Sequence, residues 1–274
     1  MVRQGTPLKP LAWYKKLATK RGRLAAGMFL VEGERAIRQI AAAHAEAIVE
    51  LLATAECEIG DLQVPIRYLT PSQFRRVCST QTPQGIVAVV RFPQDTYSDQ
   101  LPPRCGSHIL LLEDIQDPGN VGTLIRTAAA FRFSGVLLTD KCADPFAPKC
   151  VQATAGSVLS VWLRRTPHYL ALADSLQQQG YTLAAADLEG HAEPTILSGQ
   201  EQLLLALGNE TAGLSPSLLR TAQVRFAIPM DRSRAESLNV ATCGAICMYL
   251  SAQTTSESTT GGRCFRTTVS SANP

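Results

Sequence analysis

Three short segments of this 274-residue chain carry most of the side chains that could do chemistry. The first is Asp-Pro-Gly-Asn-Val-Gly-Thr-Leu-Ile-Arg, with Asn120 at the start of an expected helix and Arg126 further along it. At about 100° per residue, Arg126 lies off the buried stripe of that helix, which is formed by Val121, Leu124, Ile125 and Ala128. An arginine there can stabilise a developing negative charge. Alternatively, Asn120 caps the helix and Arg126 is a solvated charge.

The other two segments each follow a predicted strand. In Leu-Gly-Asn-Glu-Thr-Ala-Gly-Leu, Gly208 lets another backbone or a ligand approach, so Gly208 and Glu210 belong either to an ordinary turn or to a ligand loop. The third segment ends a strand with Ile-Pro-Met, and Ser237 or Asn239 opens the last helix. Taken alone, these two residues are ordinary helix caps.

The three segments can form one site only if a sheet brings them together, and the hydrophobic runs of the chain predict such a sheet. Helical patterns separate most of these runs, which is typical of a parallel sheet covered by helices. The runs are 108–113, 135–139, 159–163, 181–186, 203–207 and 224–228. Ligands of open α/β folds bind at the carboxyl ends of the strands, where the polar segments begin. At residues 117–120, proline followed by glycine predicts a type II turn with positive φ at Gly119.

The chain also predicts a division into parts. Residues 28–90 alternate four short strands with helical patterns such as 34–47, which indicates a smaller α/β domain. Three prolines mark a linker at 93–107. Residues 252–274 are rich in serine, threonine and glycine, and we expect this tail to be disordered.

Composition narrows the classes of function. With 45% apolar and 18% charged residues the chain is typical of globular proteins, and it lacks both a membrane-length apolar run and a secretory signal. The eight cysteines include no CxxC pair, so we expect structural cysteines, no metal site and a cytoplasmic protein. The net charge of +3 hides an asymmetry, because residues 1–23 carry seven bases and no acid while the remainder carries 19 bases and 23 acids. This basic end predicts a polyanionic partner.

In order and spacing, the three segments together resemble the SpoU (TrmH-like) branch of the SPOUT RNA 2′-O-ribose methyltransferases over residues 108–250. The stretch from Lys9 to Gly33, which includes Gly-Met-Phe-Leu-Val-Glu-Gly, is similar to the L30e-like substrate-binding domain that precedes many such enzymes. The resemblance implies an α/β fold: a C-terminal parallel sheet with helices on both faces and a deep trefoil knot. It implies a substrate-binding domain at 1–92, a methyltransferase domain at 108–251 and a homodimer.

The resemblance also assigns roles to residues. S-adenosylmethionine is the implied methyl donor and RNA the implied partner. The implied catalytic residues are Asn120, Arg126, Glu210, Ser237 and Asn239. The loops that bind the methyl donor contain Gly208, Ile228, Met230, Leu238 and Asn239. The bases expected to contact RNA phosphates are Lys9, Lys15, Lys16, Lys20, Arg21 and Arg23.

Ribosomal RNA is the expected substrate, because the appended N-terminal domain is more typical of enzymes that act on it, and transfer RNA is the alternative. Two other classes compete with this interpretation. A nucleotide-dependent oxidoreductase needs Gly-x-Gly-x-x-Gly after its first strand, but the chain offers only Gly119 and Gly122. A non-catalytic RNA-binding protein of the same fold would have lost residues such as Asn120, Arg126 and Asn239, which are all present.

Overall fold

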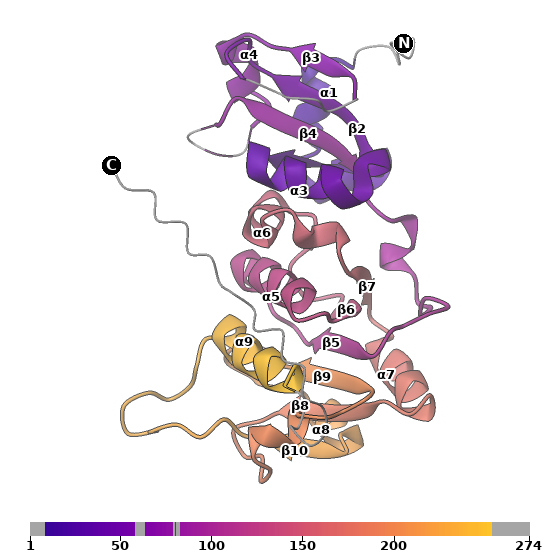
Figure 1. The fold of residues 1–274 in the computed structure, drawn as a ribbon, viewed down its shortest axis with the longest axis vertical. Coiled ribbons are helices and arrows are strands. Elements are labelled where there is room, and N and C mark those ends of the chain that lie inside the picture. Colours follow the sequence, from indigo (N-terminus) through magenta and orange to yellow (C-terminus); the bar gives the residue numbers. More distant parts are fainter. Residues whose placement is uncertain (1–8, 58–63, 79, 81–82, 254–274) are drawn as a thin grey trace, which may run out of the picture.

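The computed structural model describes residues 9–57, 64–78, 80 and 83–253, which form two α/β units joined end to end (Figure 1). Most of the expected disordered tail, residues 254–274, lies outside the described residues. None of the described helices is both long and apolar enough to cross a lipid bilayer.

The N-terminal unit is a four-stranded sheet with helices on both faces. Its strands are β1 (Met28–Glu32), β2 (Ile48–Ala53), β3 (Ile66–Tyr68) and β4 (Ile86–Arg91), in the order β1-β4-β2-β3. Strand β4 is antiparallel to β1 and β2, and β3 is parallel to β2. One face packs against α3 (Glu34–His44). The other packs against α1 (Leu11–Lys16), the residues after it and α4 (Pro71–Arg75), while α2 (Lys20–Ala26) lies beside β1.

The C-terminal unit is a sheet of six parallel strands in the order β10-β8-β9-β5-β6-β7, as the alternating pattern predicted. The strands are β5 (His108–Leu112), β6 (Gly135–Thr139), β7 (Trp162–Thr166), β8 (Thr182–Ala186), β9 (Leu203–Leu207) and β10 (Val224–Phe226). Strand β7 starts three residues later than the run 159–163, because the short 3₁₀ helix η3 (Ser157–Leu159) precedes it.

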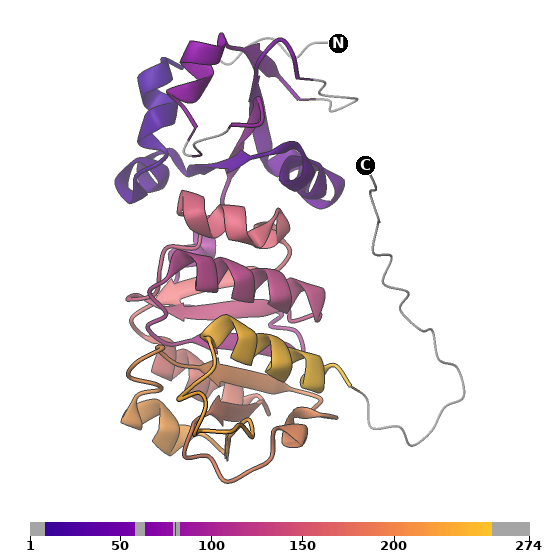
Figure 2. The ribbon, with the colours of Figure 1, turned by 90° about the vertical axis from the view of Figure 1, so that its left-hand side faces the viewer.

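Helices cover both faces of this sheet, because successive residues of its strands are buried on opposite sides. Helices α5 (Pro118–Ala130), α6 (Pro148–Thr154) and α9 (Val240–Ser251) share one face with Leu110 and Leu112 of β5 (Figure 2). Helices α7 (Tyr169–Gln178) and α8 (Pro216–Thr221) cover the other with Ile109 and Leu111. Strands buried on both faces are largely apolar, as the central strands β5 and β9 are here.

The turn predicted at residues 117–120 is wrong. Helix α5 begins at Pro118, Gly119 lies inside its first turn, and its φ is not positive. The carboxylate of Asp117 accepts a hydrogen bond from the backbone N–H of Asn120 at 2.9 Å, so Asp117 and not Asn120 caps the helix. Proline suits the first helical position because its φ is already helical and that position needs no N–H donor.

The residues between the two sheets are ordered against the C-terminal unit. They contain the 3₁₀ helix η2 (Gln94–Tyr97), in which Thr96 is fully buried. On β7, the Arg164 guanidinium donates to the Gln100 carbonyl at 2.7 Å and pairs with Asp95 at 2.5 Å. The proline-rich connection is therefore a packed segment and not a loose tether.

Both units contribute to one continuous apolar cluster. Phe146, in the loop after β6, is buried between Phe29 of β1 and Phe92, with ring centroids 4.8 and 4.9 Å away. Nearby, Gly156 at φ +98° lies so close to α3 that a Cβ would stand 2.7 Å from the Ala36 carbonyl oxygen. The two units thus meet through close packing.

We expect Phe146→Ala to lower the free energy of unfolding by about 3–5 kcal/mol, because it empties a buried aromatic site. Urea denaturation followed by circular dichroism measures this loss. The control is Phe131→Ala, since Phe131 is only half-buried against Tyr249 and its loss should be smaller. Equal losses in the two variants would contradict close packing between the units.

Candidate active site

The site is built on the carboxyl end of β5, the strand between β9 and β6. Glu113, which follows β5, is buried, and its carboxylate accepts hydrogen bonds from the Tyr169 hydroxyl and from the Ser215 backbone N–H. Burial, together with the bond to Glu113, raises the pKa of Tyr169 to about 12, so this hydroxyl remains a proton donor. Glu113 therefore joins β5 to α7 and α8.

The next residue, Asp114, adopts a left-handed conformation with φ +57°, which is uncommon outside glycine. Its carboxylate accepts a hydrogen bond of 2.6 Å from Thr139 at the end of β6, and its backbone N–H donates to the same hydroxyl oxygen at 2.9 Å. Its carbonyl accepts from the Asn209 side chain at 2.9 Å. Asp114 thus ties the ends of three neighbouring strands together and directs the chain into α5.

The loop after β9 folds back on itself. The Asn209 side-chain oxygen accepts from the backbone N–H groups of Thr211 and Ala212, and backbone hydrogen bonds join Asn209 to Gly213. A Cβ at Gly208 would stand 2.3 Å from the Gly213 carbonyl carbon. The close approach at Gly208 is therefore made by the protein's own backbone.

Three of the five residues implied as catalytic form one hydrogen-bonded chain. The Asn120 side-chain amide donates to Glu210 at 2.8 Å, and the Asn239 amide donates to the Asn120 side-chain oxygen at 3.2 Å. Asn239 also caps α9, because its side-chain oxygen accepts from the N–H groups of Ala241 and Thr242. Three segments distant in sequence thus converge on one exposed group of amides and a carboxylate.

Among the described residues, the other two implied catalytic residues take no part in these hydrogen bonds. Arg126 is exposed on α5, roughly 120° around the helix from Asn120. Within the described residues no carboxylate forms an ion pair with it. Ser237 is exposed two residues before the Asn239 cap. Both are open to a substrate.

The apolar residues implied for donor binding follow β10 and precede α9. Ile228, Met230 and Leu238 are half-buried, and Ile228 packs against the same cluster as α5 and α9. They offer partly exposed apolar surface beside the polar group, which is a usual composition for a ligand pocket. No set of His, Cys, Asp and Glu within the described ranges is grouped to hold a metal ion.

The basic residues of the N-terminal helices differ in exposure. Lys9, Lys15, Lys16, Lys20 and Arg21 are exposed. Arg23 is 4% exposed, and its guanidinium donates to the carbonyls of residues 17 and 18 and pairs with Asp144. Arg23 is therefore corrected from an RNA contact to an internal ion-pair partner, since its donors face the protein.

Sequence reasoning missed Asp114, Asn209 and Lys149 as organisers of the site. Lys149 of α6 binds the Asp117 cap at 3.0 Å. In the sequence, only the positions of Asp114 and Asn209 just after buried strands pointed to these roles, because their hydrogen-bond partners come from other strands.

Comparison with known proteins identifies the family of this chain. The model of the SpoU rRNA Methylase family matches residues 107–249, and that of the MRM3-like substrate binding domain matches residues 13–88. The chain belongs to the SpoU rRNA methylase family.

Relatives and a solved structure fit this assignment. One is the 23S rRNA (guanosine(2553)-2′-O)-methyltransferase RlmP of Bacillus subtilis, 35% identical over 242 residues, which cover 86% of this chain and 93% of the relative. A second is the 23S rRNA (uridine(2479)-2′-O)-methyltransferase of Streptomyces viridochromogenes, 29% identical with 86% of each chain covered. The crystal structure of the SpoU methyltransferase AviRb from S. viridochromogenes with AdoMet has a TM-score of 0.76 and 27% identity, covering 88% of this chain and 96% of that one.

We expect Asp117→Ala to lower the free energy of unfolding by about 1 kcal/mol at pH 7, because the cap of α5 is lost. Asp117→Asn is the control, since it keeps a cap and removes only the exposed pair with Lys149. Equal losses for Ala and Asn in urea denaturation would contradict the capping role.

The effect of Asp117→Ala should also depend on pH. The hydrogen bond from Lys149, followed by that from the Asn120 N–H, lowers the pKa of Asp117 below its ordinary value of 3.8. The charged carboxylate therefore stabilises the fold fully above the ordinary pKa, and this contribution disappears as the pH falls through the lower folded value.

Proposed function

We propose that this protein is an S-adenosylmethionine-dependent RNA 2′-O-ribose methyltransferase that acts on ribosomal RNA. The observation that carries the proposal is the hydrogen-bonded chain of Asn120, Glu210 and Asn239 at the carboxyl edge of the sheet, in a member of the SpoU family. The names of its relatives favour ribosomal over transfer RNA. Residues 1–92 bind substrate, 93–107 connect, and 108–251 carry the reaction.

The residues present suit the methyl donor. Ile228, Met230 and Leu238 have partly exposed apolar side chains that can hold an adenine ring, and Gly208 shapes the loop beside them. Glu210 carries a negative charge next to this loop, which suits the amino group of the methionine moiety. When bound, S-adenosylmethionine supplies an activated methyl group.

The chain's own residues then have two tasks. They must align the ribose 2′-hydroxyl and stabilise the negative charge that grows on its oxygen as the proton leaves. Arg126 has an exposed guanidinium that can hydrogen-bond that oxygen and an adjacent phosphate. Because a guanidinium stays protonated, Arg126 acts electrostatically and not as a base.

The remaining residues orient this arginine and the substrate. Asn239 already has its oxygen on the α9 backbone and its amide on Asn120, so it fixes the relative position of α5 and α9. Ser237 is exposed and has its hydroxyl available to the ribose. In this scheme Asn120 and Asn239 hold the site, and Arg126 and Ser237 contact RNA.

We expect Arg126→Ala to reduce methyl transfer to ribosomal RNA by about 10²–10³-fold while leaving the affinity for S-adenosylmethionine unchanged. Labelled methyl incorporation measures the first quantity and calorimetry the second. Arg220→Ala is the matched control, because Arg220 is exposed on α8 on the opposite face. Parallel loss of donor binding and turnover would contradict the electrostatic role of Arg126.

The exposed bases of α1 and α2 give the N-terminal unit its part in the function. Lys15, Lys16, Lys20 and Arg21 lie close together in the chain and point to solvent, where phosphates can reach them. With Lys9 they form the proposed RNA contact, from which Arg23 is now excluded.

The triple variant Lys15→Gln, Lys16→Gln and Lys20→Gln should bind RNA more weakly and reduce the slope of log affinity against log salt by about 2. Filter binding of ribosomal RNA across a salt series measures this slope. Arg220→Gln should leave it unchanged. An unaltered slope in the triple variant would show that these bases do not contact phosphate.

Further features of the family stay predictions for this chain. A homodimer is supported by the apolar outer face of α9, where Tyr249 is 54% exposed and Leu250 is half-buried. A deep trefoil knot is expected in the C-terminal third of the chain. A cytoplasmic location also stays a prediction.

A further inference from the structure

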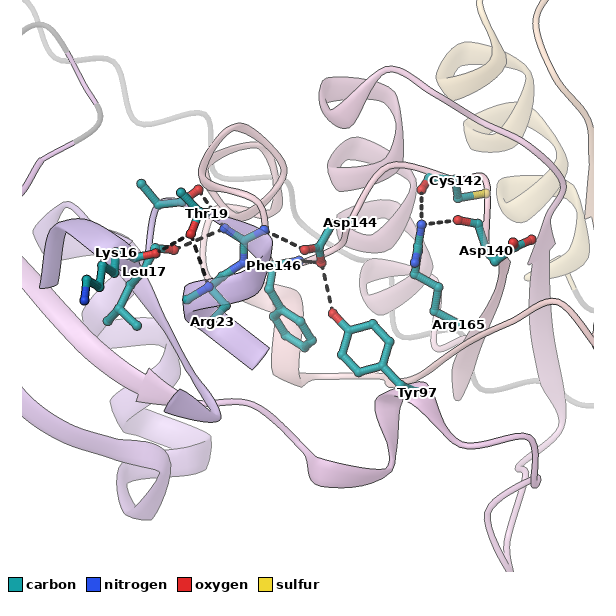
Figure 3. Close-up of polar contacts among 12 residues, drawn as sticks. Lys16, Leu17, Thr19, Arg23, Tyr97, Asp140, Cys142, Asp144, Phe146 and Arg165 are labelled. Atoms are coloured by element: carbon teal, nitrogen blue, oxygen red, sulfur yellow. Dashed lines mark hydrogen bonds and ion pairs between the residues drawn. The ribbon is translucent and has the colours of Figure 1, made fainter. Parts of the chain in front are cut away.

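One buried ion pair crosses between the two units. Arg23 of α2 pairs with Asp144, in the loop between β6 and α6, at 2.5 Å, and the two side chains are only 4% and 10% exposed (Figure 3). The same guanidinium donates to the carbonyls of Leu17 and Ala18 at 3.1 and 2.9 Å. Arg23 therefore holds the turn between α1 and α2 and binds the C-terminal unit at the same time.

Besides its ion pair with Arg23, Asp144 accepts hydrogen bonds from the connecting segment and from its own loop. Its second oxygen accepts from the Tyr97 hydroxyl at 3.2 Å and from the Phe146 backbone N–H at 3.0 Å (Figure 3). Burial, and then the charge of Asp144, raise the pKa of Tyr97, which keeps its hydroxyl protonated as a donor. One carboxylate thus joins the substrate-binding unit, the connecting segment and the methyltransferase unit.

The pair fixes geometry more than it adds stability. Desolvation of two charges cancels much of their attraction, so a buried ion pair is weak evidence for stabilisation. Here the buried Nε–H of Arg23 also has no hydrogen-bond partner among the described residues, which is a further cost. The apolar contact of Phe146 already joins the units. What the ion pair adds is direction, because a guanidinium and a carboxylate bond only in defined orientations.

The position of the pair relates it to the active site. Asp144 follows β6 at the carboxyl edge of the sheet, the edge that also holds Asn120 and Glu210. Helix α6 begins four residues after Asp144, carries Lys149 bonded to the cap of α5, and packs on α5 so closely that a Cβ at Gly122 would stand 2.3 Å from a carbonyl oxygen of α6. The short segment from Asp144 into α6 therefore does two things: it contacts α2 through Asp144, and it supports α5 through Lys149 and the close packing of α6.

We infer that the Arg23–Asp144 pair is a positioning contact for methyl transfer: it fixes the exposed bases of α1 and α2 at the edge of the sheet where the reaction occurs. Arg23 touches neither RNA nor donor, and it acts through Lys15, Lys16, Lys20 and Arg21. This inference rests on the proposed function. It gives a buried base of the N-terminal basic cluster a role different from that of its exposed neighbours.

The test compares Arg23→Ala and Tyr97→Phe with the wild-type protein. Tyr97→Phe removes one hydrogen bond to Asp144 without leaving a buried charge unpaired, so it keeps the test valid if Arg23→Ala folds poorly. The control is Arg225→Ala, which breaks an ion pair of the same length, with Asp187, inside the methyltransferase unit. Three quantities are measured: kcat/KM for ribosomal RNA, S-adenosylmethionine affinity by calorimetry, and maximum dimension by small-angle X-ray scattering.

In Arg23→Ala we expect unchanged donor affinity, a larger maximum dimension, and a kcat/KM for RNA lowered by about tenfold to a hundredfold. Tyr97→Phe should show the same pattern to a smaller degree, and Arg225→Ala should show none of it. Unchanged kcat/KM and scattering in Arg23→Ala would overturn the inference, and so would a loss of donor affinity in step with activity, since that marks general destabilisation.

Failure of the proposed function can be distinguished from failure of this inference. If the wild-type protein methylates no ribosomal RNA, the reaction is wrong, and the scattering of Arg23→Ala still decides whether the pair fixes the two units. An unchanged maximum dimension would then refute the positioning role.

Discussion

The structure depends on the burial of one parallel sheet on both faces. Because helices cover both sides of β5, β6 and β9, the ends of these strands are where polar side chains can gather. Just beyond the end of β5, the backbone N–H of Asp114 donates to the Thr139 hydroxyl, and the Asp114 carbonyl accepts from the Asn209 side chain. These hydrogen bonds between strand ends support the candidate site.

Polar side chains at that edge act mainly on one another. Asn120 is held by Glu210 and Asn239, and Asn239 is held in turn by the first N–H groups of α9. A network in which each amide has its partners resists rearrangement. Arg126 and Ser237 lie outside these hydrogen bonds and are exposed, which is why we propose that they contact the RNA ribose.

The N-terminal unit is joined to this edge by apolar packing and by one directional contact. Phe146 supplies contact area between the sheets, while Arg23 and Asp144 restrict their orientation. In the proposed scheme, the basic helices are thereby held in a fixed orientation to the candidate active site. An arginine that belongs by sequence to the N-terminal basic cluster is instead buried in an ion pair.

Much of the fold followed from the sequence, because its signals are local. Alternating apolar runs predicted all six strands of the parallel sheet, and the stripe on α5 predicted that Arg126 is exposed. The order of the three polar segments predicted the family.

The sequence could not decide which residue caps α5, because Asp117, Pro118 and Asn120 all suit a helix start. Only the folded chain shows which carboxylate accepts from which backbone N–H. Nor could it reveal the fate of Arg23, because its partner Asp144 lies 121 residues away and burial depends on the docking of two units. Local patterns thus determined the elements and the residues of the site, whereas tertiary structure decided their partners, since hydrogen bonds and ion pairs depend on distances that only folding sets.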